Sequence, residues 1–128
     1  MEPRSSKMIL VIDDDELLRI SLQSSLRNIG FAVEVADNGQ AGLEMALTIH
    51  PDLIIVDYQM PLMNGIEVIE KLRADDSWGA KVPIIFATNV YDIAVVNQIL
   101  QLDVRDYLLK NDISLDDVKA QVAKYVRP

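Results

Sequence analysis

The sequence predicts a doubly wound α/β domain, in which helices cover both faces of a parallel β-sheet. Three observations support this prediction. Short apolar runs alternate with amphipathic segments, most of the runs are rich in β-branched residues, and polar or acidic residues follow several runs directly. Runs of this kind are typical of strands buried on both faces of a parallel sheet, and the helices between them supply right-handed crossovers.

The five predicted strands are short. The runs at residues 8–12, 53–56 and 84–87 are unbroken and apolar, whereas Glu34 interrupts the run at 32–36. The fifth run, at 107–109, contains only three residues. Because buried strands of parallel sheets read as continuous apolar segments, we expect all five runs to lie in one sheet.

The segments between and after these runs predict five helices, at residues 16–29, 40–48, 66–73, 92–102 and 114–126. In the first segment, Leu18, Leu22 and Leu26 recur at helical spacing. Ser114 precedes the last segment and Asp117 follows three residues later, which resembles a capping box with Asp in place of Glu. The order of elements is therefore strand and helix, repeated five times.

Composition restricts the possible functions. The chain has 128 residues, which suits a single domain, and we assign residues 1–6 to a polar tail and residues 7–128 to the domain. It has no cysteine, which fits the reducing cytoplasm and excludes thiolate metal sites. The net charge of −8 argues against direct binding to nucleic acid. No apolar run approaches the roughly 20 residues of a membrane span.

Chemically useful residues follow four of the predicted strands. Asp13 and Asp14 follow the first strand, Asp57 the third, Thr88 the fourth and Lys110 the fifth. The carboxyl ends of parallel strands meet at one edge, where α/β proteins bind ligands. Clustered carboxylates repel one another unless a cation is present, and Mg²⁺ prefers oxygen ligands. Acidic residues after a strand also begin helices, so residues 13–16 alone leave both interpretations open.

Asp57 is the candidate nucleophile. A carboxylate can form an acyl phosphate when a metal ion and a cation neutralise the incoming group. Lys110 could supply that cation, and Thr88 could donate its hydroxyl to a phosphoryl oxygen. Each of these residues taken singly fits an ordinary structural role, and their joint position at strand ends favours the functional one.

From residue 7 to residue 126 the sequence resembles the receiver domain of two-component response regulators, in the manner of chemotaxis regulators. The motifs are ILVIDDD at 9–15, DYQMPLMNG at 57–65, FAT at 86–88 and DYLLK at 106–110. The resemblance implies a flavodoxin-like fold with strand order 2-1-3-4-5. It also implies a phosphoprotein that binds Mg²⁺ and catalyses only its own phosphorylation and dephosphorylation.

The resemblance assigns a role to each matching residue. Asp57 accepts the phosphoryl group, Asp14 binds Mg²⁺ directly, and Asp13 binds it through water. The main-chain carbonyl of Gln59 is the remaining protein ligand. Lys110 pairs with the phosphoryl group or, before transfer, with Asp57.

Two further residues form the implied switch. Thr88 is the switch hydroxyl, and Tyr107 turns inward when Thr88 moves.

Pro61 and Gly65 shape the loop after the third strand, where glycine tolerates a backbone position that other residues resist.

The implied phosphodonor is a histidine kinase or a histidine phosphotransfer protein. The fourth helix, fifth strand and fifth helix would change conformation and contact a downstream protein or a second copy of the chain. Residues 93–102 contain no charged residue and are mostly apolar, and exposed apolar surfaces often mark interfaces. A merely well-buried fourth helix is the alternative.

Some positions depart from the commonest family pattern. Asn111 replaces the proline that usually follows the lysine, so we expect a trans peptide bond there. Asn89 stands where a small residue is common, and Asp103 and Val104 replace a frequent Gly-Ala. The side chains at Gln59 and Val90 are expected to influence the lifetime of the phosphoryl group.

Three other functions fit parts of the sequence. A haloacid-dehalogenase-type phosphohydrolase would need a second aspartate at Gln59 and usually a cap insertion. A flavin-binding flavodoxin would need a phosphate-binding first loop, which residues 13–16 would repel. A degenerate receiver that only docks proteins would not need Asp57, Thr88 and Lys110 together.

Overall fold

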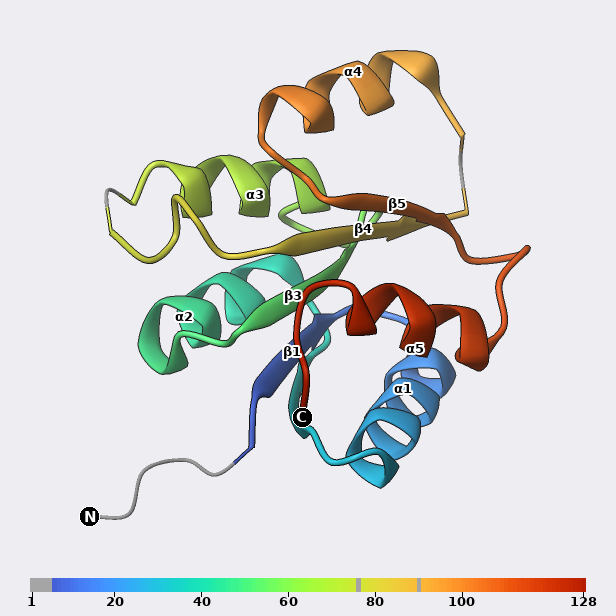
Figure 1. The fold of residues 1–128 in the computed structure, drawn as a ribbon. Helices are drawn as coiled ribbons and strands as arrows, with labels where there is room; N and C mark the ends of the chain where they lie inside the picture. Colours follow the sequence, from blue (N-terminus) through green and yellow to red (C-terminus); the bar gives the residue numbers. More distant parts are fainter. Residues whose placement is uncertain (1–5, 76, 90) are drawn as a thin grey trace.

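The computed structural model describes residues 6–75, 77–89 and 91–128, and it has the predicted architecture (Figure 1). One sheet contains five parallel strands in the order β2-β1-β3-β4-β5. Residues 1–5 of the predicted tail and Val90 lie outside the described residues. The elements are β1 (Met8–Ile12), α1 (Glu16–Asn28), β2 (Ala32–Ala36), α2 (Gly39–Ile49), β3 (Leu53–Asp57), α3 (Gly65–Arg73), β4 (Ile84–Thr88), α4 (Ile93–Gln101), β5 (Asp106–Leu109) and α5 (Leu115–Ala123).

The helices form a layer on each side of the sheet (Figure 1). Ile9 and Val11 of β1 pack in the cluster that includes α1 and α5, whereas Leu10 and Ile12 pack in the cluster with α2, α3 and α4. Side chains alternate between the two faces of a strand, so one apolar run serves both cores. No helix in the described part of the chain is long and apolar enough to cross a membrane.

Burial differs between the middle and the edges of the sheet. All residues of β3 and β4 are buried, as is β1 after Met8. The two edge strands β2 and β5 are partly exposed, and Glu34 of β2 faces solvent. The burial that unbroken apolar runs predict is therefore found in β1, β3 and β4, whereas the edge strands β2 and β5 have a neighbouring strand on one side only.

Polar side chains begin all five helices. The N-caps are Asp15, Asn38, Asn64, Asp92 and Ser114, and each accepts a hydrogen bond from a backbone N–H of the first turn. The predicted capping box is confirmed, since Ser114 Oγ accepts from the Asp117 N–H at 3.1 Å and Asp117 Oδ2 accepts from the Ser114 N–H at 2.9 Å.

Gly65 begins α3 directly beside the end of β3. Its N–H donates to the Tyr58 carbonyl at 2.8 Å, and a Cβ atom at this position would lie 2.1 Å from the backbone oxygen of Asp57. Among the described glycines a positive φ occurs only at Gly30, so Gly65 is required by close approach and not by an unusual backbone conformation. This contact places α3 against the residue that carries the candidate nucleophile.

We expect Gly65→Ala to lower the free energy of unfolding by roughly 1–3 kcal/mol, because the methyl group must displace the backbone of Asp57 or α3. Urea denaturation followed by circular dichroism measures this change. A midpoint equal to that of the wild type would contradict the close packing described for this position.

Candidate functional site

The predicted site residues meet at the carboxyl edge of the sheet. Asp13 follows β1, Asp57 ends β3, Thr88 ends β4 and Lys110 follows β5. The sheet register pairs β3 with β4 and β4 with β5 up to these last residues. The Lys110 N–H donates to the Thr88 carbonyl at 2.8 Å, which continues the β4–β5 ladder by one residue and brings the lysine to this edge.

Three carboxylates form the acidic part of the site. Asp13, Asp14 and Asp57 each have an oxygen within 4.8 Å of the other two. Asp13 and Asp57 are buried, with exposed fractions of 2% and 5%, whereas Asp14 is exposed. A cluster with two buried acids and one open acid can hold a hard cation and still admit a ligand from solvent.

The acidic run after β1 divides between two roles. Asp15 caps α1, because its Oδ1 accepts from the Leu18 N–H at 3.2 Å. Asp13 turns into the site, and its Oδ1 accepts from the Asp15 N–H at 2.9 Å. Asp15 therefore begins the helix, whereas Asp13 and Asp14 belong to the acidic cluster, and their role as magnesium ligands stays a prediction.

Lys110 neutralises part of this charge. Its Nζ atom lies 2.9 Å from Asp13 Oδ2 and 3.3 Å from Asp57 Oδ1, and its side chain is only 11% exposed. Burial alone would lower the pKa of Lys110, but its hydrogen bond to Asp13 and the charges of both aspartates outweigh this effect and raise the pKa. The lysine therefore remains protonated between the carboxylates.

The surroundings of Asp57 make its carboxyl group less acidic than usual. Burial, followed by the charge of Asp13, raises its pKa from the ordinary value of 3.8 to about 6, although Lys110 and the Tyr58 N–H act in the opposite direction. The Tyr58 N–H donates to Asp57 Oδ1 at 2.8 Å. The ionised form of Asp57 is therefore poorly compensated by the protein alone, and an added cation would favour it.

An open cleft of about 430 Å³ adjoins Asp14. It is lined by Asp14, Tyr58, Gln59, Met60, Pro61 and Asn64. The donors at this edge are carboxylate oxygens, which fit Mg²⁺ and not a soft metal. Gln59 is exposed in the loop after β3, and the role of its carbonyl as a metal ligand stays a prediction.

The two predicted switch residues lie on neighbouring strands. Thr88 is buried, with 1% exposure, and Tyr107 is half-buried on β5. The ring of Tyr107 lies 5.7 Å from that of Phe86 and 6.0 Å from that of Tyr91, which precedes α4. Burial raises the pKa of Tyr107, and a hydrogen bond from the backbone of Asp92 acts against this. Tyr107 therefore connects the sheet with the start of α4.

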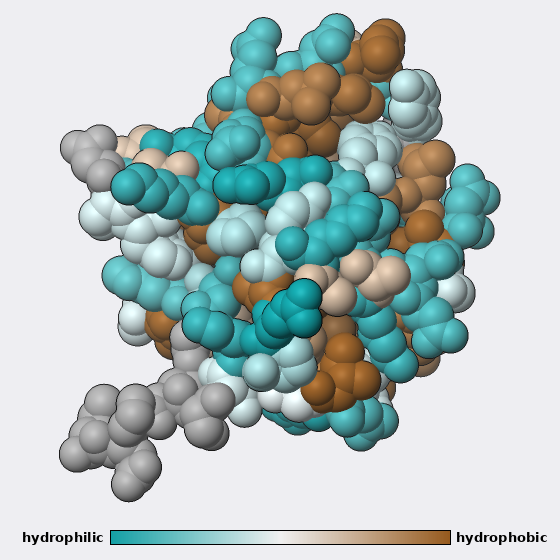
Figure 2. All heavy atoms as spheres, in the orientation of Figure 1, coloured by the Kyte–Doolittle hydropathy of each residue, from teal (hydrophilic) through white to brown (hydrophobic). Residues whose placement is uncertain are grey.

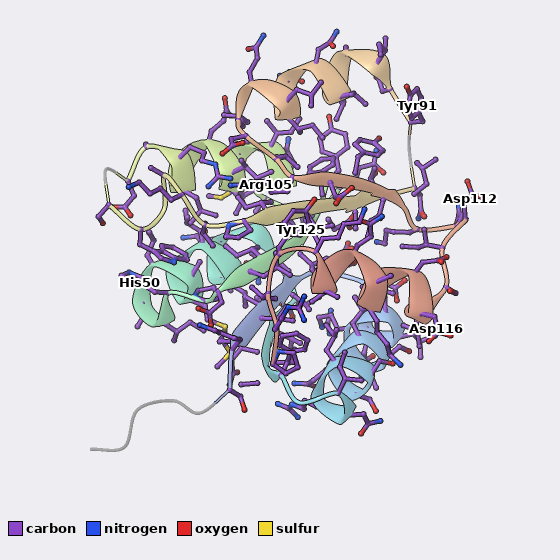
Figure 3. The ribbon with its side chains drawn as sticks, in the orientation of Figure 1. His50, Tyr91, Arg105, Asp112, Asp116 and Tyr125 are labelled. Atoms are coloured by element: carbon purple, nitrogen blue, oxygen red, sulfur yellow. The ribbon has the colours of Figure 1, made fainter. Side chains whose placement is uncertain are left out.

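The only histidine lies away from this site. Figure 3 places His50 at the opposite end of the molecule from Tyr91 and Asp112, which lie in the loops after β4 and β5. The His50 ring stacks on Trp78 at 4.6 Å, and Trp78 Nε1 donates to the Pro51 carbonyl at 3.2 Å. Trp78 thus packs against the loop before β3, and His50 takes part in this packing.

Residues that depart from the family pattern take ordinary or locally strained conformations. No cis peptide bond occurs among the described residues, which include Lys110 and Asn111, as we expected. Asn89 is exposed. Asp103 has a positive φ of 55°, a conformation that glycine adopts at lower cost.

Two residues near the site were not predicted from the sequence. Arg19 Nη1 donates to the Asp13 carbonyl at 2.9 Å and so holds the backbone of the acidic loop. A basic residue one turn into the first helix was the available signal. Leu62, in the loop after β3, is 91% exposed and has a positive φ of 71°, which is unusual for a bulky residue and has no sequence signal of its own.

Comparison with known proteins identifies the family. Residues 9–123 match the response regulator receiver domain family. The chain is 35% identical to the response regulator MprA of Mycobacterium ulcerans over 122 residues, which are 95% of this chain and 51% of that protein. It is 30% identical to the Regulator of RpoS of Escherichia coli K12 over 127 residues, 99% of this chain and 37% of that protein. The chain thus spans about half or less of these relatives.

Solved structures agree in fold. The Vibrio cholerae chemotaxis protein CheY4 superimposes with a TM-score of 0.87 at 23% identity, covering 95% of this chain and 100% of that one. A CheY-like receiver domain protein from Methanospirillum hungatei JF-1 also gives 0.87, at 24% identity, covering 94% of this chain and 93% of that one. The strand order and the family match agree, and this chain belongs to the response regulator receiver domains, the signalling switches of two-component systems.

Proposed function

We propose that this chain takes a phosphoryl group onto Asp57 from the phosphohistidine of a partner histidine kinase or histidine phosphotransfer protein. The observation that carries the proposal is the position of Lys110 Nζ between Asp13 and Asp57, beside an open third carboxylate. A buried carboxylate, a fixed cation and a set of oxygen ligands are the components that acyl-phosphate formation requires.

Asp13, Asp14, Asp57 and the Gln59 carbonyl are the groups that we propose hold Mg²⁺. When bound, the ion neutralises charge on the phosphoryl oxygens. Because Lys110 already engages Asp13 Oδ2, we expect Asp14 and Asp57 to bind the ion more directly than Asp13 does.

The proposed transfer forms one bond and breaks one. An Asp57 oxygen attacks phosphorus, the P–N bond to the donor imidazole breaks, and the imidazole keeps the electron pair. Oδ1 of Asp57 already accepts from the Tyr58 N–H and contacts Lys110, so Oδ2 is the oxygen that we propose forms the new P–O bond. Lys110 then balances the charge of the phosphoryl group.

The response to this modification is proposed to pass through Thr88 and Tyr107 to α4. The Thr88 hydroxyl would donate to a phosphoryl oxygen, and Tyr107 would turn toward the space that Thr88 leaves. Tyr107 contacts Tyr91 and the backbone of Asp92 just before α4. Movement of Tyr107 would therefore displace the amino-terminal end of this helix.

We propose that the α4-β5-α5 face binds a downstream protein or a second copy of the chain. Figure 2 shows apolar atoms gathered on the surface over α4. Tyr91, Ile93 and Leu100 are 65%, 62% and 64% exposed, and α4 itself carries no charged residue. The net charge of −8 makes a protein partner more suitable than nucleic acid for this face. We therefore propose that phosphorylation of Asp57 controls binding at this face, and that the chain acts as a signalling switch and not as an enzyme for other substrates.

Beryllofluoride with Mg²⁺ tests the acceptor. We expect one protein-bound fluoride signal in ¹⁹F nuclear magnetic resonance for the wild type, and its loss in Asp57→Asn. Asp116→Asn is the matched control, since its side chain is 93% exposed on α5. An adduct that persists in Asp57→Asn would refute the assignment, and steady turnover of a small phosphate ester would favour a hydrolase.

The pKa of Asp57 predicts a pH-dependent stability. Because the pKa rises from 3.8 to about 6 on folding, the folded state disfavours the ionised carboxylate. The resulting loss in the free energy of unfolding grows as the pH rises through this interval and is constant above it. In metal-free protein Asp57→Asn should therefore raise the free energy of unfolding by on the order of 3 kcal/mol at about pH 8, and by about a third of this near pH 4.5.

Urea denaturation at both pH values measures this difference, with Asp116→Asn again as the control. Equal stability of Asp57→Asn and wild type at the higher pH would contradict the buried, poorly compensated charge. Added Mg²⁺ should stabilise the wild type more than Asp57→Asn.

Thr88→Ala tests the switch. We expect the variant to form the beryllofluoride adduct, because Asp57 and Lys110 are unchanged, but the amide shifts in the first turn of α4 should fall to less than half of the wild-type values. Thr48→Ala, in an exposed position of α2, serves as the control. Wild-type shifts in Thr88→Ala would exclude the hydroxyl as the link.

A further inference from the structure

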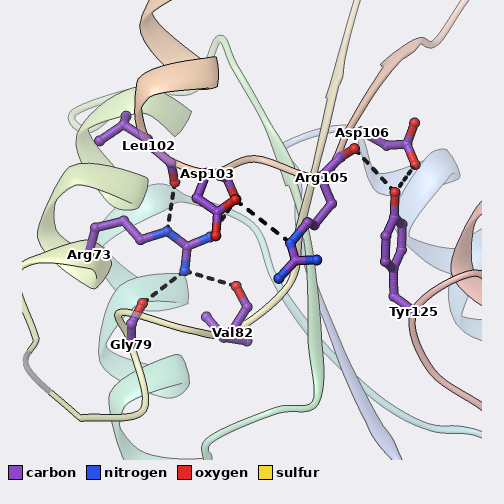
Figure 4. Close-up of polar contacts among 8 residues, drawn as sticks. All are labelled: Arg73, Gly79, Val82, Leu102, Asp103, Arg105, Asp106 and Tyr125. Carbon is purple, nitrogen blue, oxygen red and sulfur yellow. Dashed lines mark hydrogen bonds and ion pairs between the residues drawn. The ribbon is translucent and has the colours of Figure 1, made fainter.

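Arg73, the last residue of α3, forms a hydrogen-bond cluster at the end of the sheet opposite to Asp57. Its Nη1 donates to the carbonyls of Gly79 at 2.9 Å and Val82 at 2.8 Å, in the loop before β4. Its Nε donates to the Leu102 carbonyl at 2.7 Å, and its Nη2 to the Asp103 carbonyl at 3.0 Å. Figure 4 shows the guanidinium among these carbonyls, and we call this set the Arg73 cluster.

The Arg73 cluster joins three parts of the chain. Gly79 and Val82 belong to the α3–β4 loop, whereas Leu102 is the C-cap of α4 and Asp103 follows it. The last carbonyls of a helix lack partners within the helix and carry partial negative charge, which a guanidinium satisfies well. Arg73 therefore holds the carboxyl-terminal end of α4 against α3 and the start of β4.

The chain that leaves this cluster is also held. Tyr125, beyond α5, donates its hydroxyl to the Asp106 carboxylate and to the Arg105 carbonyl, the latter at 3.1 Å (Figure 4). Asp106 begins β5, and the Arg105 N–H donates to the Ile84 carbonyl at 2.9 Å. The turn between α4 and β5 is thus fixed on both sides.

The opposite end of α4 has weaker attachments among the described residues. Asp92 caps the helix, and its backbone hydrogen-bonds Tyr107. Tyr91 touches the Tyr107 ring edge-on at 6.0 Å but is mostly exposed, as is Ile93. This end follows Thr88 closely in the chain, and both Tyr91 and Asp92 contact Tyr107, a side chain that the proposed switch moves. The two ends of α4 are therefore held unequally.

We propose that Arg73 is the fixed point about which α4 moves. A change at Thr88 displaces the amino-terminal end of α4, while the Arg73 cluster keeps the carboxyl-terminal end in place. The helix thus swings instead of shifting along its whole length, and its apolar residues near Ile93 move further than those near Leu102. This inference rests on the proposed function, since it assumes that modification of Asp57 reaches α4.

Amide hydrogen exchange with Arg73→Met tests the fixed point directly, without any adduct. The Leu102, Asp103 and Val104 N–H groups donate to the Ile99 or Leu100 carbonyls and report on this end of α4. We expect their exchange to accelerate by about tenfold or more in Arg73→Met, because several charge-assisted hydrogen bonds are lost. Arg105→Met is the matched control: it removes a charge from the same turn, together with the ion pair between Arg105 and the Asp103 carboxylate at 3.9 Å, but it removes none of the hydrogen bonds from Arg73 to the backbone carbonyls.

Arg73→Lys is the second variant, for the case that Arg73→Met does not fold. A lysine keeps the charge but cannot reach all four carbonyls with one ammonium group, so we expect a smaller acceleration at the same three amides. Exchange at wild-type rates in both variants, or equal acceleration in Arg105→Met, would overturn the assignment of Arg73 as the anchor.

The same variants with Mg²⁺ and beryllofluoride test the swing. In the wild type, amide shifts should be largest in the first turn of α4 and small at Leu102 and Asp103, and in Arg73→Lys they should extend to both ends. Equal shifts at both ends of the wild-type helix would overturn the proposal. Absence of any shift in wild-type α4 would instead refute the proposed switch, and the exchange experiment would still decide whether Arg73 anchors the helix.

Discussion

The ammonium group of Lys110, placed between the buried carboxylates of Asp13 and Asp57, is the interaction on which the site depends. It allows two acids to remain close together at the edge of an apolar sheet, yet it does not fully compensate them, since the pKa of Asp57 stays near 6. Residual negative charge of this kind favours a hard cation, and we propose that the bound cation in turn allows a phosphoryl group to enter. The same imbalance makes the folded protein sensitive to what binds there.

The parallel sheet brings these groups together and also connects them with α4. Asp57 and Thr88 end neighbouring strands, which is why we propose that a group bound to Asp57 would contact the Thr88 hydroxyl. Phe86 and Tyr107 continue from there toward Tyr91 at the start of α4. The carboxyl-terminal end of α4 is held differently, by hydrogen bonds from Arg73 to backbone carbonyls. Unequal attachment of the two helix ends is the property that would turn a local change into a directed motion.

Sequence reasoning predicted the strand and helix positions to within a few residues, and it placed the acidic residues, Thr88 and Lys110 at one edge. It did not predict the Arg73 cluster, because the four acceptors are backbone carbonyls and any sequence supplies these. It assigned Gly65 to an unusual backbone conformation, whereas the cause is an approach to the Asp57 backbone from a different element. Leu62 was overlooked for a similar reason, since its positive φ is imposed by the loop and has no counterpart in residue type.

The sequence by itself determined the fold class, since apolar runs and amphipathic segments specify burial locally and their alternation leaves few topologies. It also determined which reactive groups stand at strand ends. Only the tertiary structure decided which of these groups touch: Asp15 was taken by the helix cap, Asp13 by Lys110, and Asp14 was left open to solvent. The physical reason is that contacts across the sheet depend on strand register and on the direction of each side chain. No local sequence pattern specifies these closely enough to predict which side chains touch.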